Sequence, residues 1–433
     1  MDSIWFVYLF LPAVLLLNYL IPTKCEPFLL SIANILFLLC IQPQMLSVIF
    51  LFTAADYLLG IFLEKTEKPP VRTFFVVLSV LLNIGVFAFS QFTQHLPAIF
   101  GVSVIALVKL TYIFDLYRKK IPSVKNPFFF FATVLCFPCL TYGPINTYAD
   151  LSFSIRHSRK NLNLFGSGAS LFVYGLFKKI FLADTLSDLA QKLSCEPETV
   201  FGAWAWTICS ALALYYLLFG YAQMAQGICR MLGFKTTAGF LSPFSSTSLK
   251  EFFRRFHVSL HEFSRKYIYI PLGGNRNGVV GMSLAVLCAA MATTLWYGFS
   301  LNKVLTALFF TAALLLEQLI FGKTKNKFSI VLRTVLTYTV LLFGFVLFAG
   351  SSLTDSMNII SAMFHLKDVA VVDQTVRFYA REYAVFIFIS LFMLFDFGKK
   401  IHKWFQHKHS PVYIILYSLF HLLLLFLCTA YMI

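Results

Sequence analysis

Charged residues are scarce in this sequence: only 12% of its 433 residues are Asp, Glu, Lys or Arg, whereas 59% are hydrophobic. Soluble domains are typically about a quarter charged and about half apolar. A water-soluble fold of this length cannot hide so much apolar surface. The longest polar interval runs only over about residues 241–277, so no soluble domain fits anywhere in the chain.

A cysteine framework is also lacking. The nine cysteines are scattered and lie mostly inside apolar segments. Cys136 and Cys139 form a Cys-x-x-Cys sequence within the apolar segment 128–140, but no second pair follows that would complete a zinc site. We therefore predict buried, inert thiols, with no disulfide framework and no metal site.

Acidic residues are the rarer charge, with 19 Asp and Glu against 35 Lys and Arg and a net charge of +16. The basic residues cluster in short connections such as 118–125 and 156–160. Short basic loops of membrane proteins usually lie on the cytoplasmic side, where they meet anionic lipid headgroups. The charge pattern therefore predicts membrane lipids as partners and no nucleic acid.

Long apolar runs, such as 4–21, 74–90 and 331–349, are abundant. They approach the ~20 residues that cross a bilayer as a helix. Because they lack period-2 alternation, they indicate helices rather than barrel strands. We predict an all-α, polytopic protein with about 11–13 membrane segments, multi-pass in the cell membrane. Residues 1–433 then form a single integral membrane domain, with N-terminal helices (1–100), a core (101–305) and C-terminal helices (306–433).

The polar block 248–276 stands out among these apolar runs. Ser248 followed by Glu251 is typical of a capping-box helix start, and Pro271 with the Gly-Gly-Asn turn ends the helix near Tyr269. This predicts an amphipathic or re-entrant helix near 248–269. At about 100° per residue, phenylalanines occupy one face, and the other face carries Lys250, Arg254, His257, His261 and Arg265.

Two interpretations of that helix stay open from spacing alone. It can lie in the membrane interface with its bases among headgroups, or it can line a polar cavity inside the bundle, where polar residues mark a functional pathway. His257 and His261 are spaced i, i+4, but the glutamate found beside the first histidine of zinc peptidases is missing. We predict no metal here.

Several motifs lie in order along the chain, among them Gly143-Pro144, the segment 175–184, Gly220-Tyr221 and the block 252–276. Over roughly residues 100–305 they resemble the membrane-bound O-acyltransferase family, and are closest to its bacterial branch that acylates alginate, cellulose or teichoic acids. This resemblance implies a helical bundle with a central tunnel in a bacterial plasma membrane. An acyl group would pass there from a thioester donor, a carrier protein or coenzyme A, to a hydroxyl of a cell-envelope polymer. An extracytoplasmic transferase is an implied partner, and no cofactor is bound.

In the family a tunnel histidine, in a Trp-His-Gly motif, acts as the general base. Here the matching residues are Trp296-Tyr297-Gly298, so tyrosine replaces that histidine. A neutral phenol, with a pKa near 10, is a poor base unless Arg254 or Arg265 lowers its pKa. His257, the family's second histidine, survives. The candidate catalytic residues are His257 and Tyr297. The candidate tunnel and substrate-binding residues are Arg254, Arg255, His261, Arg265, Tyr269, Asn275, Arg276, Trp296 and Asn302.

Three functions remain open at this point. The first is an active O-acyltransferase that moves an acetyl or D-alanyl group with an altered base. The second is a catalytically inactive relative that binds lipid or a partner in envelope modification. The third, a transporter or flippase, is less favoured because the sequence shows no internal repeat. Tyr297 leaves the question of activity open.

Overall fold

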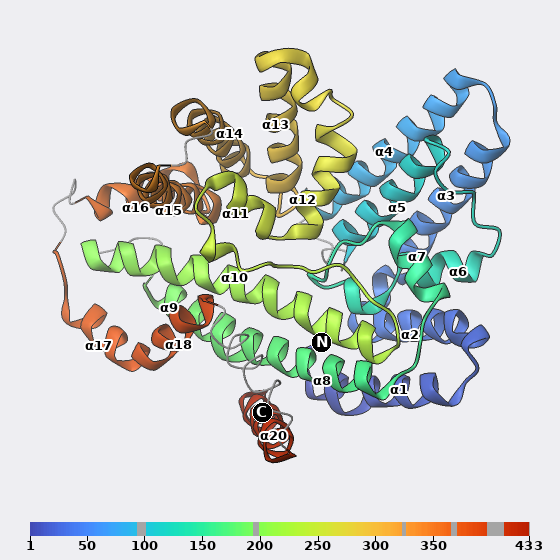
Figure 1. Cartoon of the computed structure of the whole chain (residues 1–433), viewed down its shortest axis with the longest axis horizontal. Helices are drawn as coiled ribbons and strands as arrows, with labels where there is room; N and C mark the ends of the chain where they lie inside the picture. The colour runs from blue at the N-terminus through green and yellow to red at the C-terminus, as the bar shows by residue number, and fades with distance from the viewer. Residues whose placement is uncertain (93–100, 194–198, 323–325, 365–369, 396–410, 433) are drawn as a thin grey trace. The chain divides into compact units, whose positions relative to one another are not determined.

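The computed structural model describes residues 1–92, 101–193, 199–322, 326–364, 370–395 and 411–432. Within these ranges helices joined by turns and loops make up the fold, and the one β-type pairing is an isolated bridge between Thr199 and Ala370. This confirms the predicted all-α class (Figure 1). Two compact units are formed, Met1–Val173 with Tyr221–Gly239 and Tyr174–Gly220 with Phe240–Ile433, named here unit 1 and unit 2.

Eight helices among the described residues are long and apolar enough to cross a membrane, and three shorter apolar helices accompany them. This shows a multi-pass membrane protein. The predicted number of 11–13 membrane segments stays a prediction. The eight lie at Thr23–Ile41, Pro43–Lys65, Pro69–Gln91, Val200–Met231, Gly274–Leu295, Leu301–Phe321, Lys327–Ala349 and Ile415–Met432. The division of a single membrane domain near residues 100 and 305 stays a prediction, and residues 93–100 lie outside the described residues.

Unit 1 contains the N-terminal helices. Its main elements are α1 (Leu11–Leu20), α2 (Glu26–Ile41), α3 (Leu46–Lys65), α4 (Pro69–Phe92), α5 (Val102–Tyr117), α6 (Pro127–Val134), the 3-10 turn η4 (Phe137–Cys139), α7 (Tyr148–Arg156), most of α8 (Leu162–Phe177) and the end of α10 (Val200–Met231). Helices α3, α4 and α5 pack on one another. Twelve of the 16 residues of α5 are buried, so α5 forms the centre of this three-helix group.

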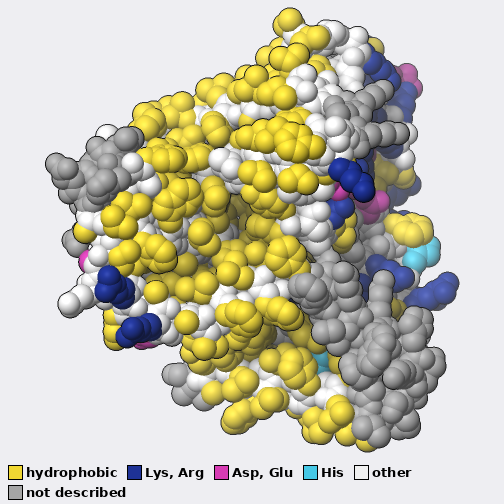
Figure 2. All heavy atoms as spheres, turned by 60° about the vertical axis from the view of Figure 1, so that its left-hand side comes forward, with side chains coloured by type: hydrophobic (Ala, Val, Ile, Leu, Met, Phe, Trp, Pro, Cys, Tyr) yellow, Lys and Arg dark blue, Asp and Glu magenta, His cyan; other side chains and the backbone are white. Residues whose placement is uncertain are grey.

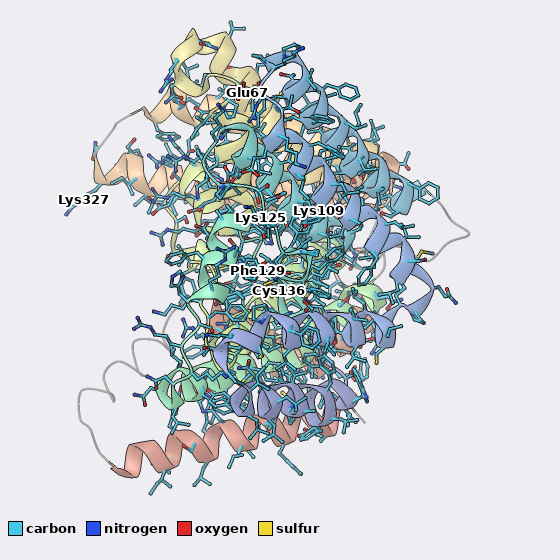
Figure 3. The ribbon with its side chains drawn as sticks, turned by 90° about the vertical axis from the view of Figure 1, so that its right-hand side faces the viewer. Glu67, Lys109, Lys125, Phe129, Cys136 and Lys327 are labelled. Carbon is cyan, nitrogen blue, oxygen red and sulfur yellow. The ribbon has the colours of Figure 1, made fainter. Side chains whose placement is uncertain are left out.

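A fully buried ion pair joins these three helices. Lys109 of α5 lies 2.8 Å from the Asp56 carboxylate of α3, and neither side chain is exposed. The α4 side chains of Ser79 and Asn83 both donate to the same carboxylate, and the Lys109 ammonium also donates to the Phe52 carbonyl. Figure 3 labels Lys109 within this group of ribbons. Because each charge has a partner, the network compensates the cost of desolvating the pair.

Unit 2 contains the C-terminal helices. Its main elements are α9 (Thr185–Leu193), most of α10, α11 (Leu249–Arg255), α12 (Val258–Ser264), α13 (Gly278–Leu295), α14 (Leu301–Phe321), α15 (Lys327–Ala349), α16 (Leu353–Met363), α17 (Gln374–Glu382), α18 (Ala384–Leu394) and α20 (Pro411–Met432). Helix α14 packs against both α13 and α15. Their outward residues are apolar: Val280 and Leu319 are more than 80% exposed. Figure 2 shows a face covered largely by hydrophobic side chains, as lipid contact requires.

Two of the family-like motifs meet inside unit 2. A Cβ atom on Gly220 of α10 would lie 2.8 Å from the Gly175 carbonyl oxygen of α8 and 3.0 Å from the Lys179 amide nitrogen. Only glycine lets the two helices approach so closely. These motif glycines therefore have a packing role.

We expect Asp56→Ala to lower the free energy of unfolding by about 3–5 kcal/mol, because the Lys109 charge would remain buried without its partner. Replacing both residues, as Asp56→Leu with Lys109→Met, removes both charges and should recover most of the loss. Thermal unfolding in detergent, followed by circular dichroism, measures the difference. Asp184→Asn, which breaks the partly exposed pair with Lys179, is the matched control. An equal effect of Asp56→Ala and the control contradicts this account.

Candidate functional site

The polar block is helical, but it is not the single helix that the sequence predicted. Helix α11 ends at Arg255, Phe256 adopts an extended backbone, and α12 begins at Val258. His257 between them has φ 47° and ψ 58°, in the left-handed region. A π-helical turn then runs over Arg265–Tyr269, so the predicted end at Tyr269 is confirmed. The prediction of one continuous polar face is wrong, because the break turns His257 away from it.

The start of α11 follows the predicted capping signal with one difference. The Ser248 hydroxyl accepts from the Glu251 amide at 3.1 Å, as in a capping box. The Glu251 carboxylate, however, accepts from the amide of Thr247, at 3.0 Å. It also pairs with Arg255 at 2.7 Å, one turn further along. Arg255, predicted to bind substrate, is therefore engaged within α11.

Glu317 of α14 anchors α11 from outside the block. Its carboxylate accepts from the backbone amides of Leu249 at 2.9 Å and Lys250 at 3.3 Å, which are free donors of the first helical turn. Arg333 of α15 lies 3.2 Å from the same carboxylate and donates to the Thr247 carbonyl at 3.1 Å. The block is thus attached to the α14–α15 hairpin. Sequence reasoning missed Glu317 and Arg333, although each is one of only two charged residues in a long apolar helix.

His257 lies in an aromatic pocket. Its side chain is buried, with the imidazole ring 5.2 Å from the Trp296 ring, 5.6 Å from Phe240 and 6.3 Å from Tyr297, measured between ring centroids. Its Nδ1 atom has no hydrogen-bond partner among the described residues. Burial lowers the pKa of His257 to about 4. The ring is therefore neutral at pH 7, with a nitrogen available to a bound molecule.

The left-handed backbone of His257 is unusual for a residue with a side chain. Such a conformation costs on the order of 1–3 kcal/mol and persists only where the surroundings impose it. Here the His257 carbonyl accepts from the His261 amide at 3.1 Å and starts α12, while the aromatic rings hold the imidazole. Strain of this kind clusters at functional sites.

Tyr297 and Trp296 lie on the turn after α13, in the same pocket as His257. Their rings are 4.7 Å apart and nearly perpendicular, and the Tyr297 ring packs edge-on against Phe348 of α15 at 5.2 Å. The half-buried Lys303 ammonium lies 3.2 Å from the centre of the Phe348 ring and donates to the Phe348 carbonyl. The structure thus brings the two predicted catalytic residues together. It also adds Lys303, which the sequence analysis missed.

Arg254, His261 and Arg265 share a separate, more exposed face. Both arginines are exposed and His261 is half-buried. Burial lowers the pKa of His261, and the positive charges of Arg265 and Arg254 lower it further, partly offset by Glu262. This part of the predicted polar face is present. Lys303, in contrast, packs on the Phe348 ring, which itself contacts Tyr297 in the aromatic pocket.

The remaining predicted site residues make local contacts. The Tyr269 hydroxyl donates to the Asn275 side chain and closes the turn that carries the exposed Arg276. The buried Asn302 amide donates to the Gly350 carbonyl at 2.8 Å and ties the start of α14 to the end of α15. These contacts are structural, and a substrate-binding role for the four residues stays a prediction.

The fold and site together define a helical, multi-pass membrane protein with a neutral histidine held in an aromatic pocket within one unit. This chain belongs to the membrane-bound O-acyltransferase family, whose model matches residues 33–359. The family predicted from the motifs is therefore confirmed. The central tunnel implied by the resemblance stays a prediction.

The relatives act on polymers of the bacterial cell envelope. The chain is 29% identical over 388 residues to the probable alginate O-acetylase of Pseudomonas syringae pv. tomato, covering 84% of this chain and 74% of the relative. It is 22% identical to the peptidoglycan O-acetyltransferase of Helicobacter pylori, covering 73% and 69% of the two chains. The teichoic acid D-alanyltransferase of Bacillus subtilis is 21% identical, over 54% of this chain and 63% of the relative.

We expect Glu317→Ala to loosen α11 without unfolding the bundle, because its first-turn amides and Arg333 lose their shared acceptor. A hydrogen bond to a charged group contributes about 1.5–3 kcal/mol, so amide hydrogen exchange over residues 249–255 should accelerate about tenfold or more. Glu262→Ala is the control, since its pair with Lys266 is half-exposed on both sides. Unchanged exchange over 249–255 would show that Glu317 does not anchor the block.

Proposed function

We propose that this protein is an O-acyltransferase that moves an acyl group of the acetyl or D-alanyl type from a thioester donor to a hydroxyl of a cell-envelope polymer. The observation that carries the proposal is His257: a buried, neutral imidazole whose Nδ1 has no partner among the described residues, held in a strained backbone next to the Trp296-Tyr297 turn. The family membership and the names of the relatives support the substrate class.

In the proposed reaction, Nδ1 of His257 takes the proton of the acceptor hydroxyl as its oxygen attacks the thioester carbonyl. The tetrahedral intermediate collapses, the C–S bond breaks, and the proton passes from the imidazolium to the leaving sulfur. The aromatic walls exclude water, which would otherwise hydrolyse the thioester. A neutral imidazole is the required starting form of a general base, and burial keeps His257 in that form.

Tyr297 is assigned a supporting role in this proposal. Its ring contacts both the His257 ring and the ring of Phe348, on which Lys303 packs. A phenol is a weaker base than imidazole at pH 7 but can donate a hydrogen bond to a developing oxyanion. The Lys303 ammonium adds a positive charge next to the pocket wall, which favours a negatively charged intermediate nearby.

The donor and partners follow from the same proposal. A protein-bound or coenzyme A thioester supplies the acyl group, and an extracytoplasmic transferase or the polymer itself accepts it. Membrane lipids surround the apolar helices, whose outward residues include Val280 and Leu319. The exposed arginines 254, 265 and 276 suit the phosphates of a carrier or coenzyme.

The test of the base uses variants that keep the local backbone. His257→Asn removes the imidazole, and asparagine tolerates the left-handed conformation, so transfer from acetyl-coenzyme A, followed by thiol release, should fall about a hundredfold or more. Tyr297→Phe should reduce it less. His157→Asn, an exposed histidine at the end of α7, is the control and should leave the rate unchanged.

Two outcomes would overturn the proposal. Equal rates for the wild type and His257→Asn would remove His257 as the base. Absence of turnover in the wild type, together with turnover in Tyr297→His, would identify a catalytically inactive relative that has kept the pocket.

The lowered pKa of His257 predicts an unusual pH profile. A histidine with an ordinary pKa near 6.5 would lose about tenfold of its neutral form between pH 7.5 and 5.5. With a pKa of about 4, His257 stays neutral over that range and protonates only as the pH falls through 4. The rate of acyl transfer, measured in matched buffers, should therefore stay nearly constant from pH 7.5 to 5.5. A decline centred near 6.5 that persists in His257→Asn would show that another group is the base, and one that is lost in this variant would contradict the lowered pKa of His257.

A further inference from the structure

Three cysteines meet inside unit 1, although only two of them are neighbours in the sequence. Cys136 follows α6, Cys139 ends the turn η4, and Cys229 lies near the end of α10. Their sulfur atoms all lie within 4.8 Å of one another, and all three side chains are buried. Figure 3 labels Cys136 in this region. The sequence analysis predicted inert thiols because it could not place Cys229.

Local geometry explains how the thiols converge. In a 3-10 turn, side chains three residues apart lie on the same side, and the Cys139 amide donates to the Cys136 carbonyl at 2.9 Å. Gly143 lets the next loop pass between this turn and α10: a Cβ atom there would lie 2.7 Å from the Cys139 Cα and 3.1 Å from the Ala225 Cβ. The family-like Gly143-Pro144 motif therefore brings η4 close to the helix that carries Cys229.

Asn146 limits what the cluster can bind. Its Oδ1 accepts from the Thr237 amide at 2.9 Å and from the Thr237 hydroxyl at 3.0 Å. A backbone amide can only donate, so the oxygen of Asn146 must face Thr237. The Asn146 nitrogen then points toward Cys139, 3.8 Å from its sulfur, and toward the Pro144 carbonyl at 3.0 Å. On that side the Cys139 sulfur meets a hydrogen-bond donor, not a metal ligand.

We propose that Cys136, Cys139 and Cys229 form a three-coordinate thiolate site for a soft monovalent cation, Cu(I). At a metal–sulfur distance of about 2.3 Å, three sulfurs around a trigonal ion lie about 4.0 Å apart, which requires shifts of less than about 1 Å from the present positions. Thiolates select soft ions. Structural Zn²⁺ almost always takes four ligands, and among the described residues no fourth His, Cys, Asp or Glu joins these three sulfurs.

Charge and protons balance in this site. Binding of one Cu⁺ to three thiols releases three protons and leaves a complex of charge −2. The amide N–H of Asn146 donates toward one of the sulfurs, which offsets part of that buried charge. The site lies in unit 1 and shares no residue with the His257 pocket, so it does not rest on the proposed acyl transfer.

The test uses the full-length protein in detergent under anaerobic, reducing conditions. Cu(I) is supplied as its bicinchoninate complex, and transfer is followed by the loss of the colour of that complex. We expect one Cu(I) per chain to be withdrawn, and X-ray absorption to show sulfur ligands only, three per ion. Cys229→Ser and Cys136→Ser should each lower the affinity at least a hundredfold. Cys209→Ser, which changes a buried cysteine of α10 outside the cluster, should retain the wild-type affinity.

Size-exclusion profiles identify any variant that does not fold, and Cys229→Ala provides a second removal of the same ligand. Several outcomes would overturn the proposal. One is that the wild type withdraws no Cu(I). Another is that Cys229→Ser and Cys229→Ala, both folded, bind as tightly as Cys209→Ser, which would indicate an adventitious ion only. Spectra with oxygen or nitrogen ligands, or preferential binding of Zn²⁺ added alone, would equally contradict a trigonal Cu(I) site.

Discussion

A polar group enclosed by apolar helices must find its partner inside the protein, because lipid offers none. Most buried polar side chains here obey this constraint. Asp56 is satisfied by Lys109, Ser79 and Asn83, and the Asn302 amide by the Gly350 carbonyl. Groups satisfied in this way hold helices together. His257 is among the exceptions: its Nδ1 has no such partner among the described residues, its ring lies among aromatic rings, and a ligand can supply the missing partner.

The position of His257 depends on contacts that lie outside its own segment. Glu317 and Arg333 hold the first turn of α11, and the Tyr338 hydroxyl of α15 donates to the Phe244 carbonyl at 2.6 Å just before it. The far end of α11 is held by the Leu241 amide, which donates to the Arg255 carbonyl at 3.0 Å. With both ends of α11 attached, the chain has to break at Phe256 and His257 to continue into α12. The strain at His257 is therefore set by the bundle.

Sequence patterns predicted the structure correctly where it depends on interactions between residues that are near in the sequence. The apolar runs gave helices, Ser248 gave a helix start through its own side chain, and Gly273 gave a turn with positive φ. The motifs gave the family, because residues such as Gly143 and Gly220 are required by close backbone approaches. The prediction from the helical period was wrong at one residue, His257. A regular 100° rotation placed it beside Arg254 and His261, whereas aromatic packing overrode the local helical preference.

The sequence by itself determined that this protein lies in a membrane, that it is helical and that it belongs to its family. It also located the candidate site at His257 and the Trp296-Tyr297 turn. These follow from composition, periodicity and residue order, which depend on near neighbours along the chain. Only the tertiary structure decided that His257 is buried and neutral while Arg254 is exposed, that Lys303 lies beside the pocket wall, and that Cys229 joins Cys136 and Cys139. Each of these depends on side chains far apart in sequence, whose meeting is set by the packing of helices.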